Sequence, residues 1–200
     1  MVSRADGRAG GPLIGVLALQ GDFEAHARML RRLGTEVREV RVPEDLRGLA
    51  GLVLPGGEST VMMLGIEREG LAEPLRELAA AGMPMLGTCA GMIVLDREHL
   101  GILDIRARRN AFGRQTRSFE ADLEIAGLGA EGLLRAVFIR APWVEDRGPD
   151  VEVLASIDGH PVAVRQDRIV AVAFHPELGD EPRLHERLVP DAAAPRERAA

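Results

Sequence analysis

The sequence predicts a three-layer α/β protein, with a mostly parallel central sheet flanked by helices and an antiparallel extension. Three observations favour this class. Short apolar runs alternate with helical patterns over the first half of the chain. The first run, Leu13–Leu19, is continuously apolar, which is typical of a strand buried on both faces of a parallel sheet. Beyond Ile105 the pattern changes to shorter strand-like pieces, which indicates added antiparallel strands.

The first strand and helix are marked at their ends. Gln20-Gly21-Asp22 interrupts the apolar run, and Asp22 is expected to cap a helix over Phe23–Leu33. Apolar residues recur in that segment at helical spacing, and Gly34 follows it as a C-terminal glycine. Valines at 37, 40 and 42 predict a second strand.

The rest of the parallel core is expected between residues 51 and 87. Gly51–Leu54 and Pro84–Gly87 are short apolar strands, and helical patterns occupy Thr60–Ala81 between them. In such a sheet, ligands bind at the carboxyl ends of the strands. The residues that follow these two strands are therefore candidates for a functional site.

The second half is expected to add five strand-like pieces and one helix. Asp158-Gly159 and Gln166-Asp167 are typical of hairpin turns, and the helix is expected over Pro182–Val189. The strand-like pieces are Phe119–Ile125, Ala136–Ile139, Val151–Ser156, Pro161–Arg165 and Ile169–Phe174.

Length and composition indicate a single domain. A chain of 200 residues with 46% hydrophobic content can form one substantial core, and no linker divides it. We expect a flexible N-terminus over residues 1–12, one domain over 13–189 and a disordered tail over 190–200, where periodicity ends.

The composition also limits the possible functions. One cysteine excludes an internal disulfide, and the N-terminus lacks the apolar run of a signal peptide. No segment approaches the roughly 20 apolar residues of a membrane-spanning helix, so we expect a soluble, cytoplasmic protein without a membrane partner. A net charge of -6 and an aromatic content of 3% argue against nucleic-acid binding.

The cysteine lies in Gly87-Thr88-Cys89-Ala90-Gly91, directly after a predicted strand. A strand that turns sharply into a helix strains its central residue, and flanking glycines accommodate such a turn. The thiol would then lie at a helix N-terminus, where the partial positive charge favours a thiolate. A buried structural cysteine is the alternative, but the two glycines favour a nucleophile.

A histidine is the usual base for such a nucleophile, and His175 is the best candidate of the five. It follows the apolar strand Ile169–Phe174 and stands in His175-Pro176-Glu177. A spacing of two along an extended chain places the imidazole and the carboxylate on the same side, and Pro176 favours that extended conformation at His175. Glu177 can then orient the ring and stabilise its charged form.

A third motif, Gly56-Gly57-Glu58, follows the strand Gly51–Leu54. The glycines allow close approach of a ligand to backbone N–H groups, and Glu58 can accept from a ligand ammonium. An ordinary turn in which Ser59 or Thr60 caps the next helix is equally compatible with the motif alone. It is not a phosphate loop, because it lacks the Gly-Lys-Ser/Thr ending.

Together these motifs resemble the triad-type, or class I, glutamine amidotransferases, a superfamily with a flavodoxin-like fold. Within it the chain resembles the glutaminase subunits of two-subunit pyridoxal phosphate synthases, over about residues 13–189. The cysteine elbow and the His-x-Glu pair are common to the superfamily. The strings that point to the branch are Pro55-Gly56-Gly57-Glu58-Ser59-Thr60, Asn110-Ala111-Phe112-Gly113-Arg114-Gln115 and Phe138-Ile139-Arg140-Ala141-Pro142.

The resemblance implies a mechanism without a cofactor or a metal ion. Cys89 would attack the side-chain amide of L-glutamine, form a thioester and release ammonia, and water would then hydrolyse the thioester. His175 would act as acid and base, and Glu177 would orient it. The N–H groups of Ala90 and Gly57 would form the oxyanion hole.

The resemblance also implies substrate contacts and a partner. Family positions that line the glutamine site correspond to Gly56, Gly57, Glu58, Arg114, Ile139 and Arg140. Arg114 is the favoured side-chain contact for the carboxylate, because Ile139 and Arg140 are expected to act through their backbone. The ammonia would pass to a ring-shaped synthase subunit, whose docking would complete the oxyanion hole.

Two other functions stay open from the sequence. The chain could be the glutaminase subunit of a different amidotransferase, or a non-catalytic binding or redox-sensing module on the same fold. Intact His175 and Glu177 argue against the second, since sensing requires a reactive thiolate but not a base with an orienting carboxylate.

One segment departs from the family pattern. The segment 93–101 is several residues shorter than the same segment in relatives. It leaves barely two helical turns behind Cys89. Either the loop is trimmed or residues are missing from the chain as written, and the short helix favours the second interpretation.

Overall fold

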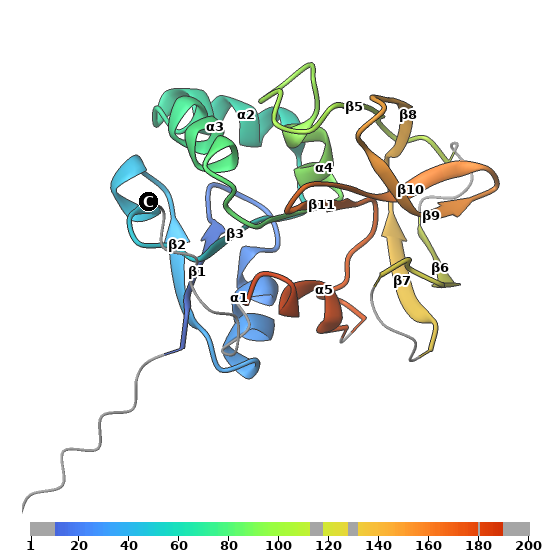
Figure 1. Ribbon diagram of the computed structural model, residues 1–200, viewed down its shortest axis with the longest axis horizontal. Helices are drawn as coiled ribbons and strands as arrows, with labels where there is room; N and C mark the ends of the chain where they lie inside the picture. Colours follow the sequence, from blue (N-terminus) through green and yellow to red (C-terminus); the bar gives the residue numbers. More distant parts are fainter. Residues whose placement is uncertain (1–10, 113–117, 128–131, 180, 190–200) are drawn as a thin grey trace, which may run out of the picture.

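A seven-stranded sheet forms the centre of the computed structural model, which describes residues 11–112, 118–127, 132–179 and 181–189 (Figure 1). Its order is β2-β1-β3-β4-β11-β10-β9, and the first five of these strands are parallel. β10 runs antiparallel to both of its neighbours. The strands are β1 (Leu13–Leu17), β2 (Glu36–Val40), β3 (Gly51–Leu54), β4 (Met85–Thr88), β9 (Glu152–Ile157), β10 (His160–Gln166) and β11 (Ile169–Val172).

Helices cover both faces of this sheet, which confirms the predicted three layers. α1 and α5 lie on one face, and α2, α3 and α4 lie on the other (Figure 1). A short 3-10 helix, η1 (Pro43–Leu46), follows β2. The α-helices are α1 (Phe23–Arg32), α2 (Ser59–Arg68), α3 (Ala72–Ala80), α4 (Ala90–Leu95) and α5 (Arg183–Glu186). Every residue of β3, β4 and β11 is buried, as their apolar sequences require.

Two antiparallel pairs extend the fold beside β10 and β9, at one end of the sheet (Figure 1). β5 (Ile105–Arg108) pairs with β8 (Trp143–Arg147), and β6 (Ser118–Leu123) pairs with β7 (Leu134–Ile139). An aromatic stack joins the second pair to the core: Phe138 lies 4.5 Å from Phe119 between ring centroids and 5.5 Å from Phe174. This packing holds the end of β7 beside the end of β11.

The structure corrects three predicted elements and adds two strands. The segment that begins at Ile169 belongs to the parallel core, because β11 pairs in parallel with β4 as well as antiparallel with β10. The final helix covers only Arg183–Glu186. Gln166 ends β10, so the turn begins at Asp167, whose φ is 53°. The strands β5 and β8 were not predicted, since they are only four and five residues long and two or three of those residues are charged.

The short segment behind Cys89 is closed by a buried carboxylate. Asp96 is fully buried and accepts from the backbone N–H of Glu98 and Ala107 at 2.9 and 3.2 Å. It also pairs with Nδ1 of His99 at 2.7 Å. All six residues of α4 are buried, so packing and these hydrogen bonds brace the helix despite its length. The segment after α4, at its present length, therefore forms a turn whose hydrogen bonds are made within the described residues.

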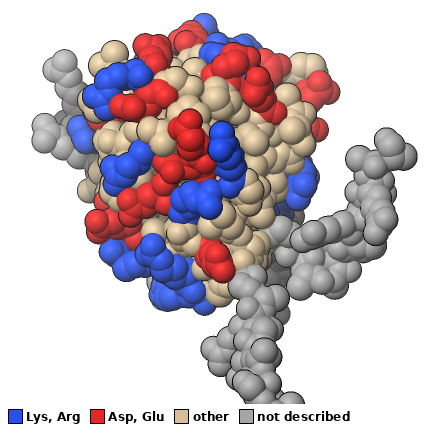
Figure 2. All heavy atoms as spheres, turned by 90° about the vertical axis from the view of Figure 1, so that its left-hand side faces the viewer, with Lys and Arg blue, Asp and Glu red and all other residues tan. Residues whose placement is uncertain are grey.

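No helix in the described ranges is long and apolar enough to cross a membrane. Figure 2 shows one face of the molecule, on which acidic and basic side chains lie interspersed. The predicted flexible N-terminus falls mostly outside the described residues, and the tail over 190–200 lies outside them entirely.

Candidate active site

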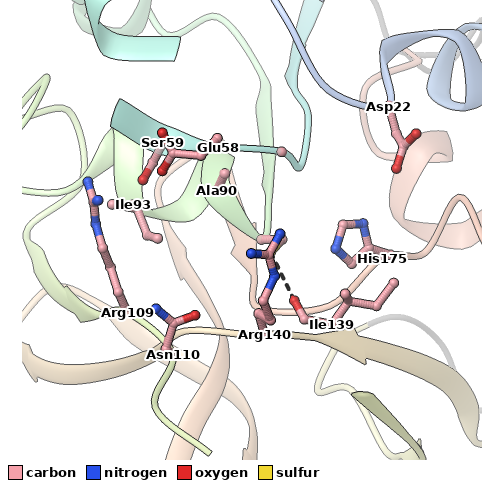
Figure 3. A pocket seen from close by; sticks show the side chains of 12 residues that line it. Asp22, Glu58, Ser59, Ala90, Ile93, Arg109, Asn110, Ile139, Arg140 and His175 are labelled. Atoms are coloured by element: carbon pink, nitrogen blue, oxygen red, sulfur yellow. Dashed lines mark hydrogen bonds between the residues drawn. The ribbon is translucent and has the colours of Figure 1, made fainter. Parts of the chain in front are cut away.

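A cleft of about 240 Å³ opens at the carboxyl ends of β3, β4 and β11 (Figure 3). This is the edge at which a parallel sheet with helical connections places its ligands. The loops that follow these strands meet the segments that follow β1, β5 and β7. The lining residues are Asp22, Gly57, Glu58, Ser59, Cys89, Ala90, Ile93, Arg109, Asn110, Ile139, Arg140 and His175.

Cys89 occupies a strained turn between β4 and α4, as its flanking glycines predict. Its φ is 48° and its ψ is -103°, a conformation that costs an L-residue about 1–3 kcal/mol. A Cβ at Gly91 would lie 2.0 Å from the backbone oxygen of Leu54, and one at Gly87 would lie 2.7 Å from Leu95. Only glycine therefore allows α4 to pack this closely against β3 and β4.

Backbone and thiol contacts fix the orientation of Cys89. Its N–H donates to the oxygen of Val172 in the neighbouring strand at 2.8 Å. The thiol lies 3.8 Å from the backbone oxygen of Ile139, at the end of β7. The Cys89 side chain lines the cleft, although the residue is only 7% exposed. The thiol is therefore accessible to a small ligand bound in the cleft and not to a large molecule.

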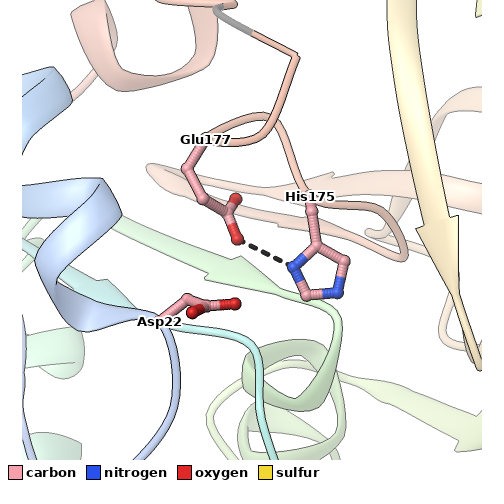
Figure 4. Close-up of side chains that lie close together, drawn as sticks. All are labelled: Asp22, His175 and Glu177. Carbon is pink, nitrogen blue, oxygen red and sulfur yellow. Dashed lines mark hydrogen bonds and ion pairs between the residues drawn. The ribbon is translucent and has the colours of Figure 1, made fainter.

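His175 and Glu177 form the pair that their spacing predicts (Figure 4). Nδ1 of His175 lies 2.7 Å from Oε1 of Glu177, and both residues are buried. The N–H of His175 donates to the oxygen of Val137 in β7 at 2.9 Å. Gly56 lies against the ring, since a Cβ there would be 2.4 Å from Cε1 of His175. The imidazole is thus held by a strand, a carboxylate and a glycine.

The electrostatics of this pair favour the imidazolium. Burial by itself lowers the pKa of His175, but Cys89 and Glu177 together outweigh it and raise the pKa to about 10. An imidazolium beside a cysteine stabilises a thiolate. At neutral pH the site is therefore suited to nucleophilic attack followed by proton delivery to a leaving group.

The Gly56-Gly57-Glu58 turn forms another wall of the cleft. Gly57 has a φ of 142°, and a Cβ there would lie 2.5 Å from Nε2 of Gln20. That Gln20 amide donates to the backbone oxygen of Glu58 at 2.9 Å. The alternative interpretation, in which Ser59 or Thr60 caps α2, is wrong: Glu58 is the N-cap, and its carboxylate accepts from the N–H of Val61 at 3.1 Å.

The predicted substrate contacts are mostly at the cleft. Gly57, Glu58, Ile139 and Arg140 line it, and Gly56 lies behind it against His175. Arg140 has a φ of 45°, so its backbone is held in an unusual conformation next to the thiol contact made by Ile139. Arg114 lies outside the described residues.

Arg109 is a cleft residue that sequence reasoning missed. Its guanidinium donates to Oγ1 of Thr60 at 2.9 Å and lies 3.4 Å from Nε2 of His99. It stands directly before the Asn110–Gln115 string, and Asn110, which also lines the cleft, has a φ of 46°. The position of this arginine, directly before a string typical of the family, was the one signal in the sequence that could have indicated a role at the cleft.

Asp22 is the second missed residue. It stands at the N-cap position of α1, but its side chain makes no capping hydrogen bond there. It instead faces the His175–Glu177 pair (Figure 4). Ligand atoms of the three residues lie within 4.8 Å of one another, so together they could hold a metal ion. The hydrogen bond between Nδ1 of His175 and Glu177 opposes this, because a metal on Nδ1 would have to displace it.

The fold and the cleft together define a class I glutamine amidotransferase. A parallel sheet with a cysteine elbow, a histidine–glutamate pair and a glycine turn at one edge is the arrangement of that class. The chain belongs to the SNO glutamine amidotransferase family, whose sequence model matches residues 16–193.

Similar proteins agree with this assignment. The chain is 52% identical over 190 residues to pyridoxal 5'-phosphate synthase subunit PdxT of Mycolicibacterium vanbaalenii, covering 89% of this chain and 96% of that protein. It is also 52% identical over 187 residues to the PdxT subunit of Mycobacteroides abscessus, with the same coverage of each chain. A crystal structure of a glutamine amidotransferase superposes with a TM-score of 0.82 at 46% identity, covering 88% of this chain and 96% of the other.

Proposed function

We propose that this glutamine amidotransferase hydrolyses L-glutamine through a thioester on Cys89 and supplies the ammonia to a pyridoxal 5'-phosphate synthase in the cytoplasm. The observation that carries the proposal is that Cys89 and the His175–Glu177 pair meet at one cleft. Cys89 stands on the strained elbow, and His175, held by Glu177 at 2.7 Å, lines the same cleft.

The reaction follows from the charge states of these groups. The Cys89 thiolate attacks the side-chain carbonyl carbon of glutamine, and the imidazolium of His175 gives its proton to the departing nitrogen as ammonia leaves. Neutral His175 then takes a proton from the water that attacks the thioester, and the C–S bond breaks. This restores the Cys89 thiolate beside the imidazolium and releases the product acid, which ionises to glutamate in solution. Throughout, Oε1 of Glu177 accepts the Nδ1–H and keeps the ring oriented.

The remaining cleft residues serve binding and charge stabilisation. The N–H groups of Gly57 and Ala90 stabilise the oxyanion, where losing one donor typically costs about 3 kcal/mol of barrier. Glu58 accepts the substrate ammonium. Arg114 or Arg140, with Arg109 as a further cation at the cleft, binds the substrate carboxylate.

The partner is proposed from the names of the relatives. Proteins 52% identical over most of this chain are named subunits of pyridoxal 5'-phosphate synthase. We therefore propose that the ammonia acceptor is the synthase subunit of that enzyme, in a ring-shaped hetero-oligomer, and that its docking raises the glutaminase rate.

One experiment tests both parts. The chain is mixed with the candidate synthase subunit, ammonia release from glutamine is measured with and without it, and a glutamine-analogue electrophile is mapped by mass spectrometry. We expect stimulation by the synthase and labelling at Cys89, and no ammonia from a Cys89→Ala variant. Absence of labelling in the complex would refute the thioester. Stimulation only by a different synthase would reassign the acceptor.

A further inference from the structure

Two buried histidines lie behind the His175–Glu177 pair, and the proposed mechanism does not use them. His26 in α1 and His185 in α5 are each 0% exposed. Nδ1 of His26 lies 2.8 Å from Nε2 of His185, and Nε2 of His26 lies 3.1 Å from Oγ1 of Thr88 and 3.4 Å from Oε2 of Glu177. These contacts form a continuous chain from α5 to the carboxylate that orients His175.

Both histidines are neutral at physiological pH. Burial lowers the pKa of His26 well below its ordinary value, and nearby His185 and His175 lower it further. Burial likewise lowers the pKa of His185 to about 4, against the raising effect of Glu181, while Arg32 lowers it further. Each ring therefore carries one N–H and one lone pair, and only one proton lies between the two rings.

Two tautomeric arrangements are possible, and they have different consequences for Glu177. If His26 donates to His185 through Nδ1, its Nε2 carries a lone pair that faces Oε2 of Glu177. His185 must then carry its proton on Nδ1, on the side where the backbone of Glu181 raises its pKa. This arrangement opposes two electron pairs and leaves Oε2 of Glu177 without a donor, and an unpaired buried charged group costs more than an unpaired neutral one.

The reverse arrangement gives the buried carboxylate a donor. His185 donates through Nε2 to Nδ1 of His26, and His26 carries its proton on Nε2, toward Thr88 and Glu177. Oε2 of Glu177 has no hydrogen bond within the described residues and lies 3.4 Å from this nitrogen, so the N–H of His26 supplies the donor it lacks. Because a charged acceptor forms the stronger hydrogen bond, this arrangement is the favoured one.

We propose that His26 is a positioning residue for Glu177, and that His185 sets the tautomer of His26 that donates to it. The inference rests on the proposed roles of Cys89, His175 and Glu177. It extends the three-residue arrangement to a buried chain of five: His185 to His26 to Glu177 to His175 to Cys89.

The effect on the reaction is through the carboxylate. With its second oxygen bonded, Glu177 keeps its charge and the plane in which it accepts the Nδ1–H of His175. Asp22, which faces the same pair from the start of α1, is exposed and solvated, so it does not replace this buried donor. Loss of the donor leaves a buried carboxylate oxygen unpaired, which favours rotation of the Glu177 side chain away from His175.

The test compares three substitutions in the full-length chain. His26→Leu removes both nitrogens, and His26→Gln keeps an amide N–H that can reach Glu177. His160→Leu is the matched control, since His160 stacks on Trp143 in β8 outside the cleft. Glutaminase kinetics are measured with the synthase subunit present. Alkylation of Cys89 by iodoacetamide is measured against pH on the chain alone, and Cys89 is the only thiol in the sequence.

We expect His26→Leu to lower kcat roughly 10- to 100-fold with little change in KM, as the loss of one hydrogen bond to a charged group predicts. We also expect its alkylation profile to move to higher pH by about one unit, because the imidazolium of His175 is less stabilised. His26→Gln should recover most of both effects, and His160→Leu should match the unmodified protein.

Other outcomes overturn the inference. An unchanged kcat and an unchanged alkylation profile in His26→Leu would show that His26 does not act on the pair. A lowered melting temperature with a normal profile would assign it a purely structural role. If the unmodified chain shows an alkylation profile that His175→Gln leaves unchanged, the proposed function itself fails, so the two failures are distinguishable.

Discussion

Substitution of Gly56 by alanine is expected to disable the site by a steric effect on His175. Gly56 does not have a positive φ, so alanine can adopt its backbone conformation without strain. The added Cβ would lie 2.4 Å from Cε1 and 3.0 Å from Nδ1 of His175. Carbon atoms in contact lie about 3.5 Å apart or more, and the ring must therefore retreat by about 1 Å.

That displacement sets the size of the effect. His175 is held by Glu177 and by the backbone of Val137, so the ring cannot move without weakening these contacts. A misplacement of about 1 Å in a catalytic group can cost about 100-fold in rate. Overpacking of a buried site costs about 1–3 kcal/mol of stability.

The assay is ammonia release from glutamine in the presence of the synthase subunit, together with thermal unfolding of the isolated chain. The control is Gly65→Ala in α2, where the nearest atom to the new Cβ is a flexible methyl group of Leu19 at 3.1 Å. We expect normal activity in the control and a loss of about 100-fold in kcat in Gly56→Ala. Normal kcat in a folded Gly56→Ala protein would refute the contact between this glycine and the catalytic ring.

Four further predictions concern the same cleft. Cys89→Gly is expected to unfold at a higher temperature than Cys89→Ala, by about 1 kcal/mol in stability, because glycine relieves the strain at φ 48°; both should lack ammonia release. The pKa of His175 is raised from 6.5 to about 10, so its contribution to stability is complete below pH 6.5 and is lost as the pH rises through about 10. Denaturant unfolding should therefore show a decline between pH 7 and 10, on the order of a few kcal/mol, that His175→Gln lacks. Glu58→Gln should raise KM for glutamine roughly 10- to 100-fold with kcat little changed, since the amide oxygen can still accept from Val61 but no longer pairs with an ammonium. Dialysis against EDTA should leave the glutaminase rate unchanged, because Nδ1 of His175 is already bonded to Glu177.

Each of these has an outcome that contradicts it. A less stable Cys89→Gly would argue against strain at the elbow. Parallel pH curves for the unmodified chain and His175→Gln would contradict the raised pKa. A lowered kcat with normal KM in Glu58→Gln would move that residue from substrate binding to the chemistry, and EDTA sensitivity would point to a metal ion at Asp22, His175 and Glu177.

The elements that sequence predicted well are those whose signals are local. The apolar runs at β1, β3 and β4 identify strands buried on both faces, and each is a few residues long. The charged strands β5 and β8 escaped prediction because they pair only with each other, outside the central sheet. Their pairing depends on partners about 40 residues apart in the chain, which no local pattern encodes.

The same distinction applies to the site. Motifs of three to five residues were sufficient to predict the elbow at Cys89 and the pairing of His175 with Glu177, because the backbone geometry of a strained turn and of an extended segment acts over that length. The local motif could not predict that Glu58 caps α2, since its competitors Ser59 and Thr60 are equally good caps by type.

What the amino-acid sequence determined by itself is the fold class and the candidate nucleophile with its candidate base, since each depends on hydrophobic periodicity or on residues within one short motif. What only the tertiary structure decided is which distant groups join them: Asp22 and Arg109 at the cleft, and His26 with His185 behind Glu177. His26 and His185 are 159 residues apart, and they meet because α1 and α5 pack on the same face of the sheet (Figure 1). Packing of helices against a sheet depends on all the buried side chains at once, so the neighbours it creates are a property of the whole fold.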